Sequence, residues 1–204
     1  MNFSTIKRVK NFISKKIFML IYSRRFKHFG AKVSIISPDI IDGEKYMSIE
    51  DNVVIQKSSW LLAFKQNDLE PELIISKGTN IGRYSHIVAL GKVLIKENVL
   101  IADKVYISDN IHQYTDIKVP IKNQIIEFKS EVIIGENSWI GENVSIIGAK
   151  IGKHCIVGSN SVVTKDIMNF SVVAGIPAQY IKRYDEMIGK WRKTNKYGEF
   201  TDEI

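Results

Sequence analysis

His112 is the residue in this chain whose type and place best suit chemistry. It opens a stretch, residues 112–129, that contains Pro120 and lacks the regular spacing found on either side. An imidazole titrates near neutral pH, so a histidine at the mouth of such a stretch can accept a proton as a general base. Asp109 and Asp116 lie close by in the sequence. Either carboxylate can orient the imidazole and stabilise its charged form, as in a catalytic triad, or can serve as a turn residue.

The element that must hold this histidine in place is a ladder of aliphatic residues spaced six apart. A short fixed period is typical of a stacked repeat, and a hexapeptide period indicates a parallel β-helix. The positions form four runs, at Ile75, Ile81 and Ile87; Ile95, Ile101 and Ile107; Ile134, Ile140 and Ile146; and Ile151, Val157 and Val163. The alternative, a β-sandwich, needs strands of varied length and turns at irregular spacing, which four such runs do not show.

Each six-residue unit is predicted to form one short strand and one corner. Glycine often follows the aliphatic residue, as at Gly82 and Gly135, and asparagine or aspartate fills many remaining positions, which suits tight corners. Three units then close a coil of about 18 residues with the aliphatic side chains inside. The predicted fold is mainly β, and residues 112–129 form an extruded loop. A loop of this length inside a compact repeat is usually functional.

Both ends of the chain are predicted to be helical. Apolar residues in the segment 1–30 follow the three-to-four spacing of an amphipathic helix. They lie at Ile6, Val9, Ile13, Ile17, Leu20 and Ile21. Residues 31–183 are expected to form the β-helix, and residues 184–204 a short helical tail.

The positive charge of the chain is concentrated in residues 1–30. They hold eight Lys or Arg and no Asp or Glu, whereas the whole chain has 29 basic and 22 acidic residues, so the remainder is close to neutral. A basic amphipathic helix can cap the open end of a β-helix or lie peripherally on an anionic membrane, and the sequence leaves both interpretations open. Nucleic-acid binding is not favoured, because the body offers no basic groove and no platform of aromatic residues.

The composition fits one globular domain in a reducing compartment. The chain has 204 residues, of which 45% are hydrophobic, enough for one sizeable core. A single cysteine excludes a disulfide framework, so we expect a cytoplasmic protein. No apolar run approaches the roughly 20 residues that span a bilayer. The early apolar run 17–22 is also too short for the core of a cleavable signal peptide.

Two segments resemble a known family. The segment IGENSWIGENVSIIGAKIGKHCIVGSNSVVTKDIMNFSVVAGIPAQYIK, which begins at Ile134, is similar to the hexapeptide-repeat acyltransferases. The segment ISDNIHQYTDIKVPIKNQ, from Ile107 to Gln124, resembles the sugar O-acetyltransferases of bacterial surface-polysaccharide pathways. The resemblance implies a left-handed parallel β-helix, a homotrimer with each site between two subunits, and no metal.

The same resemblance implies roles for individual residues. His112 stands where relatives have their catalytic histidine; many relatives have two in this motif, and the first place here is Asn110. Trp139 stands at a position that is often Trp in relatives, where it flanks the pantetheine arm or the acceptor. Tyr114 is predicted to shape the acceptor site. Acetyl-CoA, the implied donor, is expected to be contacted in the late coils by Trp139, Ser159, Thr164, Lys165, Gln179 and Lys182.

The implied function is acetyl-CoA-dependent O-acetylation of a sugar hydroxyl in a glycan or glycolipid precursor. N-acetylation of an amino sugar is an alternative, although the match around His112 and Pro120 favours O-acetylation. A zinc carbonic anhydrase needs three histidine ligands at a subunit interface, and the histidines of this chain do not have that spacing. A non-enzymatic β-helical scaffold is an alternative of a different class, against which the extruded loop argues.

Overall fold

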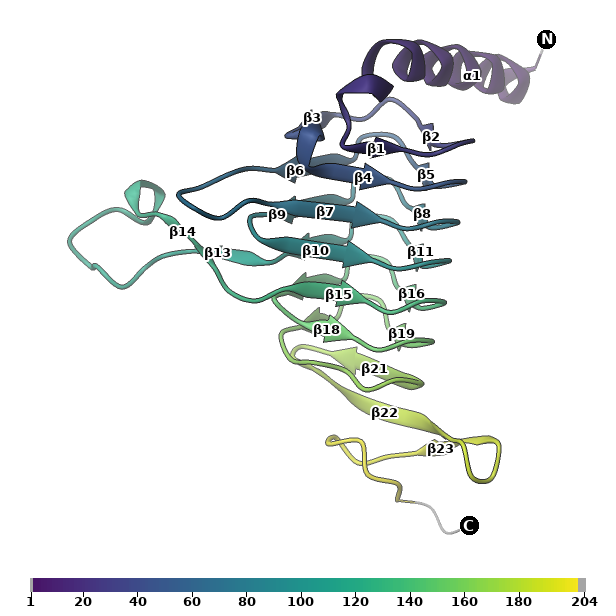
Figure 1. Cartoon of the computed structure of the whole chain (residues 1–204). Coiled ribbons are helices and arrows are strands. Elements are labelled where there is room, and N and C mark those ends of the chain that lie inside the picture. The colour runs from purple at the N-terminus through teal and green to yellow at the C-terminus, as the bar shows by residue number, and fades with distance from the viewer. Residues whose placement is uncertain (1, 202–204) are drawn as a thin grey trace.

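The computed structural model describes residues 2–201, in which a left-handed parallel β-helix follows an N-terminal α-helix (Figure 1). The β-helix has the form of a triangular prism. Strands of successive coils pair in parallel and build three sheets, one for each side of the prism. The mainly β fold predicted from the hexapeptide ladder is therefore confirmed, together with one N-terminal helix.

The three sheets take one strand from each coil in turn. The first sheet contains β1 (His28–Phe29), β4 (Met47–Ile49), β7 (Glu72–Ile75), β10 (Lys92–Ile95), β15 (Val132–Ile134) and β18 (Lys150–Ile151). The second contains β2 (Ser34–Ile35), β5 (Val54–Ile55), β8 (Asn80–Ile81), β11 (Leu100–Ile101), β16 (Trp139–Ile140), β19 (Ile156–Val157), β21 (Ser171–Gly175), β22 (Ala178–Asp185) and β23 (Lys190–Lys193). The third contains β3 (Ile40–Asp42), β6 (Trp60–Ala63), β9 (His86–Ala89), β12 (Tyr106–Ser108), β17 (Ser145–Ile147) and β20 (Val162–Val163).

The aliphatic ladder forms the core of the prism. Every residue of the four predicted runs is at most 2% exposed. In the second sheet, for example, Ile81, Ile101 and Ile140 lie in register on adjacent strands. Because side chains alternate across a strand, the neighbour of each ladder residue points outward. Leu100, beside Ile101, is accordingly 51% exposed.

Glycine and asparagine serve different purposes at the corners. A Cβ on Gly135 would lie 2.4 Å from the backbone of Gly152 in the next coil, so this position needs glycine because the coils approach closely. Positive φ angles occur instead at corner asparagines such as Asn98, Asn143 and Asn160. The expectation that glycine after the ladder residue supplies the left-handed backbone conformation is thus corrected for Gly135.

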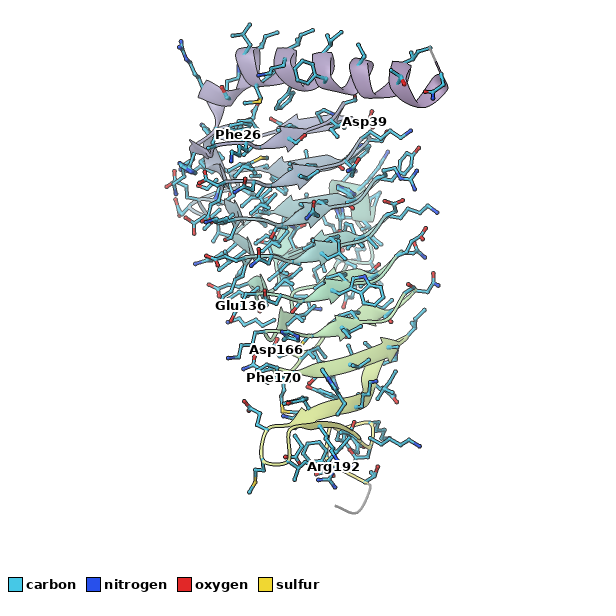
Figure 2. The ribbon with its side chains drawn as sticks, turned by 90° about the vertical axis from the view of Figure 1, so that its right-hand side faces the viewer. Phe26, Asp39, Glu136, Asp166, Phe170 and Arg192 are labelled. Carbon is cyan, nitrogen blue, oxygen red and sulfur yellow. The ribbon has the colours of Figure 1, made fainter. Side chains whose placement is uncertain are left out.

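The N-terminal segment forms the helix α1 (Phe3–Tyr22), followed by the 3-10 turn η1 (Ser23–Arg25). The side chain of Asn2 caps the start of α1 by accepting a 2.9 Å hydrogen bond from the backbone N–H of Thr5. The helix lies across the N-terminal end of the prism, above Phe26 (Figure 2). A further 3-10 turn, η2 (Glu44–Tyr46), lies between β3 and β4. Within residues 2–201, no helix is both long and apolar enough to cross a membrane.

The predicted helix in the C-terminal tail is wrong. The chain instead forms the antiparallel strands β22 and β23, which extend the second sheet beyond β21. A last strand with no partner would leave its backbone N–H and C=O groups unpaired, and β22 satisfies those of β21. The hairpin is held by an ion pair of 2.9 Å between Arg192 and Asp185, whose side chains are each only 11% exposed (Figure 2).

Candidate active site

The extruded segment leaves the prism after β12, at the corner between the third and the first sheet (Figure 1). Where it leaves the prism, the segment forms an antiparallel hairpin of β13 (Asn110–His112) and β14 (Ile126–Phe128). The loop of the hairpin contains the 3-10 turn η3 (Ile121–Asn123). His112 lies opposite Ile126 on this hairpin, and its side chain is exposed. The predicted base therefore sits on a paired strand, a more rigid support than an irregular loop.

Asp109 fixes the hairpin to the preceding coil. Its buried carboxylate accepts hydrogen bonds from the backbone N–H groups of Leu90, at 2.9 Å, and Gly91, at 2.7 Å. It also accepts one from the side chain of Asn110, at 2.8 Å, and its own carbonyl accepts one from the N–H of Lys129, at 2.8 Å. Asp109 thus joins both strands of the hairpin to the coil before them.

These contacts change the role expected of Asp109. Among the described residues, the Asp109 carboxylate has no hydrogen bond to the His112 imidazole. Its partners are two backbone N–H groups of the previous coil and the side chain of the neighbouring Asn110. The hydrogen bonds of Asp109 thus hold the hairpin that carries His112 against the preceding coil, and a positioning role for Asp109 is a prediction that these contacts favour. Asn110, at the place where many relatives have a histidine, is buried as the side-chain partner of Asp109.

Asp116 is a turn residue. Its carboxylate accepts a 2.9 Å hydrogen bond from the backbone N–H of Lys118, two residues on. The side chain of Gln124 closes the loop by donating to the carbonyls of Asp116, at 2.9 Å, and Val119, at 2.8 Å. Tyr114, predicted to shape the acceptor site, follows His112 on the same loop and is 66% exposed.

Trp139 and Ser159 lie on another side of the prism. Trp139 belongs to β16 in the second sheet, the face opposite the corner that carries the hairpin, and is 49% exposed. Ser159 is exposed at a corner just after β19, the strand next to β16. One chain therefore does not bring His112 together with Trp139 and Ser159.

Three of the predicted donor contacts meet in one pocket. Thr164, Lys165 and Gln179 line a cavity of about 300 Å³ at the C-terminal end of the prism. Thr164 and Lys165 follow β20 at the corner between the third and first sheets, the same edge from which the hairpin leaves two coils earlier. Two coil steps of about 4.8 Å separate the two places along the prism axis, or roughly 10 Å.

Two further residues line this pocket that were not predicted from the sequence, Lys196 and Tyr197. They come from the tail after β23, which folds back to the pocket because β22 and β23 reverse the chain. The predicted helical tail gave no reason to expect these two residues at the pocket. The sixth predicted contact, Lys182, is not part of the pocket lining, and its ammonium lies 5.9 Å from the centre of the Trp191 ring.

The other histidines occupy separate places. His86 lies on the outer face of the third sheet between the rings of Trp60 and Tyr106, at centroid distances of 4.8 and 5.4 Å, and burial lowers its pKa below the ordinary value of 6.5. His154 lies at a corner, 6.1 Å from the ring of Phe170. Among residues 2–201, no three or more His, Cys, Asp or Glu side chains gather as a metal site would require.

The only cysteine is a core residue. Cys155 is buried in the prism, and its Sγ lies 3.1 Å from the carbonyl oxygen of Met168. Burial raises the pKa of its thiol, so the reactive thiolate is disfavoured.

Comparison with known proteins agrees with this architecture. Residues 131–165 match the family model described as "Hexapeptide repeat of succinyl-transferase". The chain is 36% identical over 129 residues to the "Putative lipopolysaccharide biosynthesis O-acetyl transferase WbbJ" of Escherichia coli strain K12, over 59% of this chain and 65% of that protein. The chain thus spans less than two thirds of the length of this relative.

Two solved structures share the fold. A mutant of AntD, an N-acyltransferase from Bacillus cereus in complex with dTDP and Coenzyme A, superposes with a TM-score of 0.68 at 19% identity, over 83% of this chain and 90% of that chain. A maltose O-acetyltransferase from Clostridium difficile 630 gives a TM-score of 0.56 at 25% identity, over 90% of this chain and 84% of that one.

Proposed function

We propose that this chain, whose residues 131–165 match a hexapeptide-repeat family model, transfers the acetyl group of acetyl-CoA to a sugar hydroxyl in a glycan or glycolipid precursor. The observation that carries this proposal is the exposed imidazole of His112 on a hairpin fixed to the prism by Asp109. The names of the lipopolysaccharide relative and the maltose O-acetyltransferase support a sugar hydroxyl as the acceptor.

In the proposed reaction, the His112 imidazole takes the proton of the acceptor hydroxyl as its oxygen attacks the thioester carbonyl. The carbon–sulfur bond then breaks, and the imidazolium returns the proton to the departing thiolate of CoA. Proton transfer by a positioned side chain contributes roughly 10²–10⁴-fold in rate. No acyl-enzyme is formed, and the chain's buried Cys155 takes no part.

The donor nucleotide is proposed to bind in the pocket of Thr164, Lys165 and Gln179. Two ammonium groups, those of Lys165 and Lys196, suit the phosphates of CoA as point charges. The 67% exposed ring of Tyr197 offers a surface on which an adenine can stack. The pocket thus has the chemical character that CoA needs, on the same edge of the prism as His112.

A homotrimer is proposed to complete the site. His112 and Trp139 lie on opposite sides of one prism, so a site that uses both needs two copies of the chain. The loop of the hairpin also exposes apolar side chains that a neighbouring subunit can cover. These are Ile117, Val119, Ile121 and Ile125, which are 37–95% exposed.

The test is an acceptor screen in which released CoA thiol is the readout. Sugars, nucleotide sugars and amino sugars are offered to the wild type and to two variants, His112→Asn and His154→Asn. We expect a sugar hydroxyl to be acetylated, and turnover of His112→Asn to fall at least ~10²-fold. The control His154→Asn removes an exposed imidazole away from the hairpin and should keep near wild-type turnover.

Thermal unfolding with acetyl-CoA provides the second arm. A protein that binds a ligand in its native state melts at a higher temperature in its presence. We expect acetyl-CoA to raise the melting temperature of the wild type and of His112→Asn alike. No shift in either would favour the non-enzymatic scaffold. Exclusive transfer to amino sugars would favour N-acetylation, a form of the N-acyl transfer named for AntD.

A further inference from the structure

Among the side chains of α1 that the structure describes, those that pack toward the prism lie on the side of Phe18. Phe18 packs toward the core, with its ring 6.4 Å from that of the buried Phe26, which in turn lies 5.1 Å from Phe29. These aromatic rings close the N-terminal end of the prism, where α1 lies (Figures 1 and 2). The interpretation of α1 as an end cap is therefore satisfied by the Phe18 side of the helix alone.

The apolar stripe of α1 lies on the other side. An α-helix turns once in about 3.6 residues, so positions spaced three or four apart share a side, and position 18 falls roughly opposite positions 9, 13 and 20. The stripe residues are Ile6 (50% exposed), Val9 (46%), Ile13 (51%), Ile17 (52%) and Leu20 (85%). A helix that served only as a cap would bury this stripe against the prism, whereas here the prism leaves it uncovered.

The charge of the segment indicates what can cover the stripe. Residues 1–30 carry eight Lys or Arg and no Asp or Glu, while the rest of the chain is close to neutral. Described members of this set, including Lys16, Arg24 and Arg25, are exposed. Pairing two copies of α1 stripe to stripe would bring like charges together. A surface that is both apolar and negatively charged can bury the stripe and attract the basic residues at the same time.

We infer that α1 binds to the surface of an anionic lipid bilayer, with its apolar stripe in the interface and the prism standing away from the membrane. The hairpin with His112 leaves the fourth coil, three coil steps of about 4.8 Å, or roughly 14 Å, from the first. If the proposed function holds, this geometry suits an acceptor that is itself carried on a lipid, because the hairpin leaves the prism from the half that lies nearer to α1 (Figure 1). Lipid binding itself does not depend on activity.

A flotation assay with the full chain tests the inference. The vesicles are phosphatidylcholine alone or phosphatidylcholine mixed with phosphatidylglycerol. We expect the chain to float with the anionic vesicles at low salt, to be released at high salt, and to stay behind with neutral vesicles. Failure to bind anionic vesicles at low salt would overturn the inference whatever the enzyme's activity.

Variants separate the stripe from the charge. Ile13→Glu with Leu20→Glu should reduce the bound fraction at least ~10-fold, because carboxylates would replace apolar contacts in the interface. Lys16→Gln with Arg24→Gln should weaken binding and reduce its salt dependence. Met187→Glu is the matched control, since Met187 is 97% exposed on the turn between β22 and β23 and should bind like the wild type.

The competing occupant of the stripe, a second copy of the chain, has its own signature. In that case, light scattering without vesicles would show that the wild type forms larger assemblies than the double variant Ile13→Glu, Leu20→Glu. Such a difference, together with vesicle binding that the variant retains, contradicts the membrane inference. An unchanged melting temperature in the variant shows that the fold is intact, as expected for side chains that the prism does not bury.

Discussion

The carboxylate of Asp109 accepts a 2.7 Å hydrogen bond from the backbone N–H of Gly91, one coil earlier in the prism. The two residues stand at successive corners between the third and first sheets. A Cβ on Gly91 would lie 2.5 Å from the ring of Phe128, so the second strand of the hairpin packs directly on this glycine. The contact between Asp109 and Gly91 therefore determines where the hairpin, and with it His112, leaves the prism.

Removal of the Asp109 carboxylate should destabilise the fold and slow the reaction. Asp109→Ala leaves the buried N–H groups of Leu90 and Gly91 without their acceptor, which should lower the free energy of unfolding by about 2–4 kcal/mol. Urea denaturation measures this loss. The control Asp68→Ala, in an exposed loop, should change it by less than about 0.5 kcal/mol.

A positioning role for Asp109 also predicts how its loss affects the kinetic constants. The kcat of Asp109→Ala should fall because His112 moves, while the KM for acetyl-CoA stays near the wild-type value, since the donor pocket lies on later coils. A KM increase with an unchanged kcat would show that Asp109 does not position the base.

Mixed oligomers should reveal a site shared between chains. We expect His112→Asn and Trp139→Ala each to be nearly inactive alone. In randomly mixed cyclic trimers, about a quarter of the sites would combine an intact His112 from one chain with an intact Trp139 from its neighbour, and would restore about a quarter of the wild-type activity. Light scattering should give three times the 23.3 kDa chain mass. A monomeric mass, or mixing that restores nothing, contradicts the shared site.

The two lysines of the pocket should contribute to donor binding. Lys165→Gln and Lys196→Gln each remove a charge near the proposed phosphate positions, so each should raise the KM for acetyl-CoA about 5–10-fold and leave kcat nearly unchanged. The thermal shift caused by CoA should shrink in parallel. Lys65→Gln, in the exposed loop after β6, is the matched control. Unaltered KM values in both pocket variants would place the nucleotide elsewhere.

The partly buried imidazole of His86 should make the protein less stable in mild acid. Its Nε2 has no hydrogen-bond partner within the described part of the chain, and burial lowers its pKa below 6.5. Between the folded-state and unfolded-state pKa values the unfolded chain binds more protons, so the stability contributed by neutral His86 is present above about pH 6.5 and is lost as the pH falls.

Melting temperatures measured between about pH 7 and about pH 5 test this expectation. The wild type should lose more stability over this range than His86→Phe, which keeps an aromatic ring between Trp60 and Tyr106 without a titratable group. Tyr106→Phe alters the same contact and should keep the wild-type pH dependence. Equal slopes for the wild type and His86→Phe would assign the acid sensitivity to other groups.

The fold of the β-helix and the place of the candidate base along it could both be predicted from the sequence. A six-residue period is a local property, and each ladder residue from Ile75 to Val163 is buried as the period predicts. The long gap after Ile107 likewise located the extruded segment, because no side chain there continues the ladder. The fold of a stacked repeat can be predicted from such local spacing because each coil contacts only its neighbours.

Contacts between segments that no period relates depend on the tertiary structure. Asp109 lies three residues before His112 in the sequence. Its carboxylate nevertheless bonds to Gly91, because the preceding coil offers unpaired backbone N–H groups there. The tail was predicted to be helical but forms strands, because β22 pairs with β21. The resulting reversal of the chain brings Lys196 and Tyr197 to the pocket. The orientation of the α1 stripe likewise depends on tertiary packing. Phe18 packs toward Phe26 at the end of the prism, and this contact turns the stripe away from the prism.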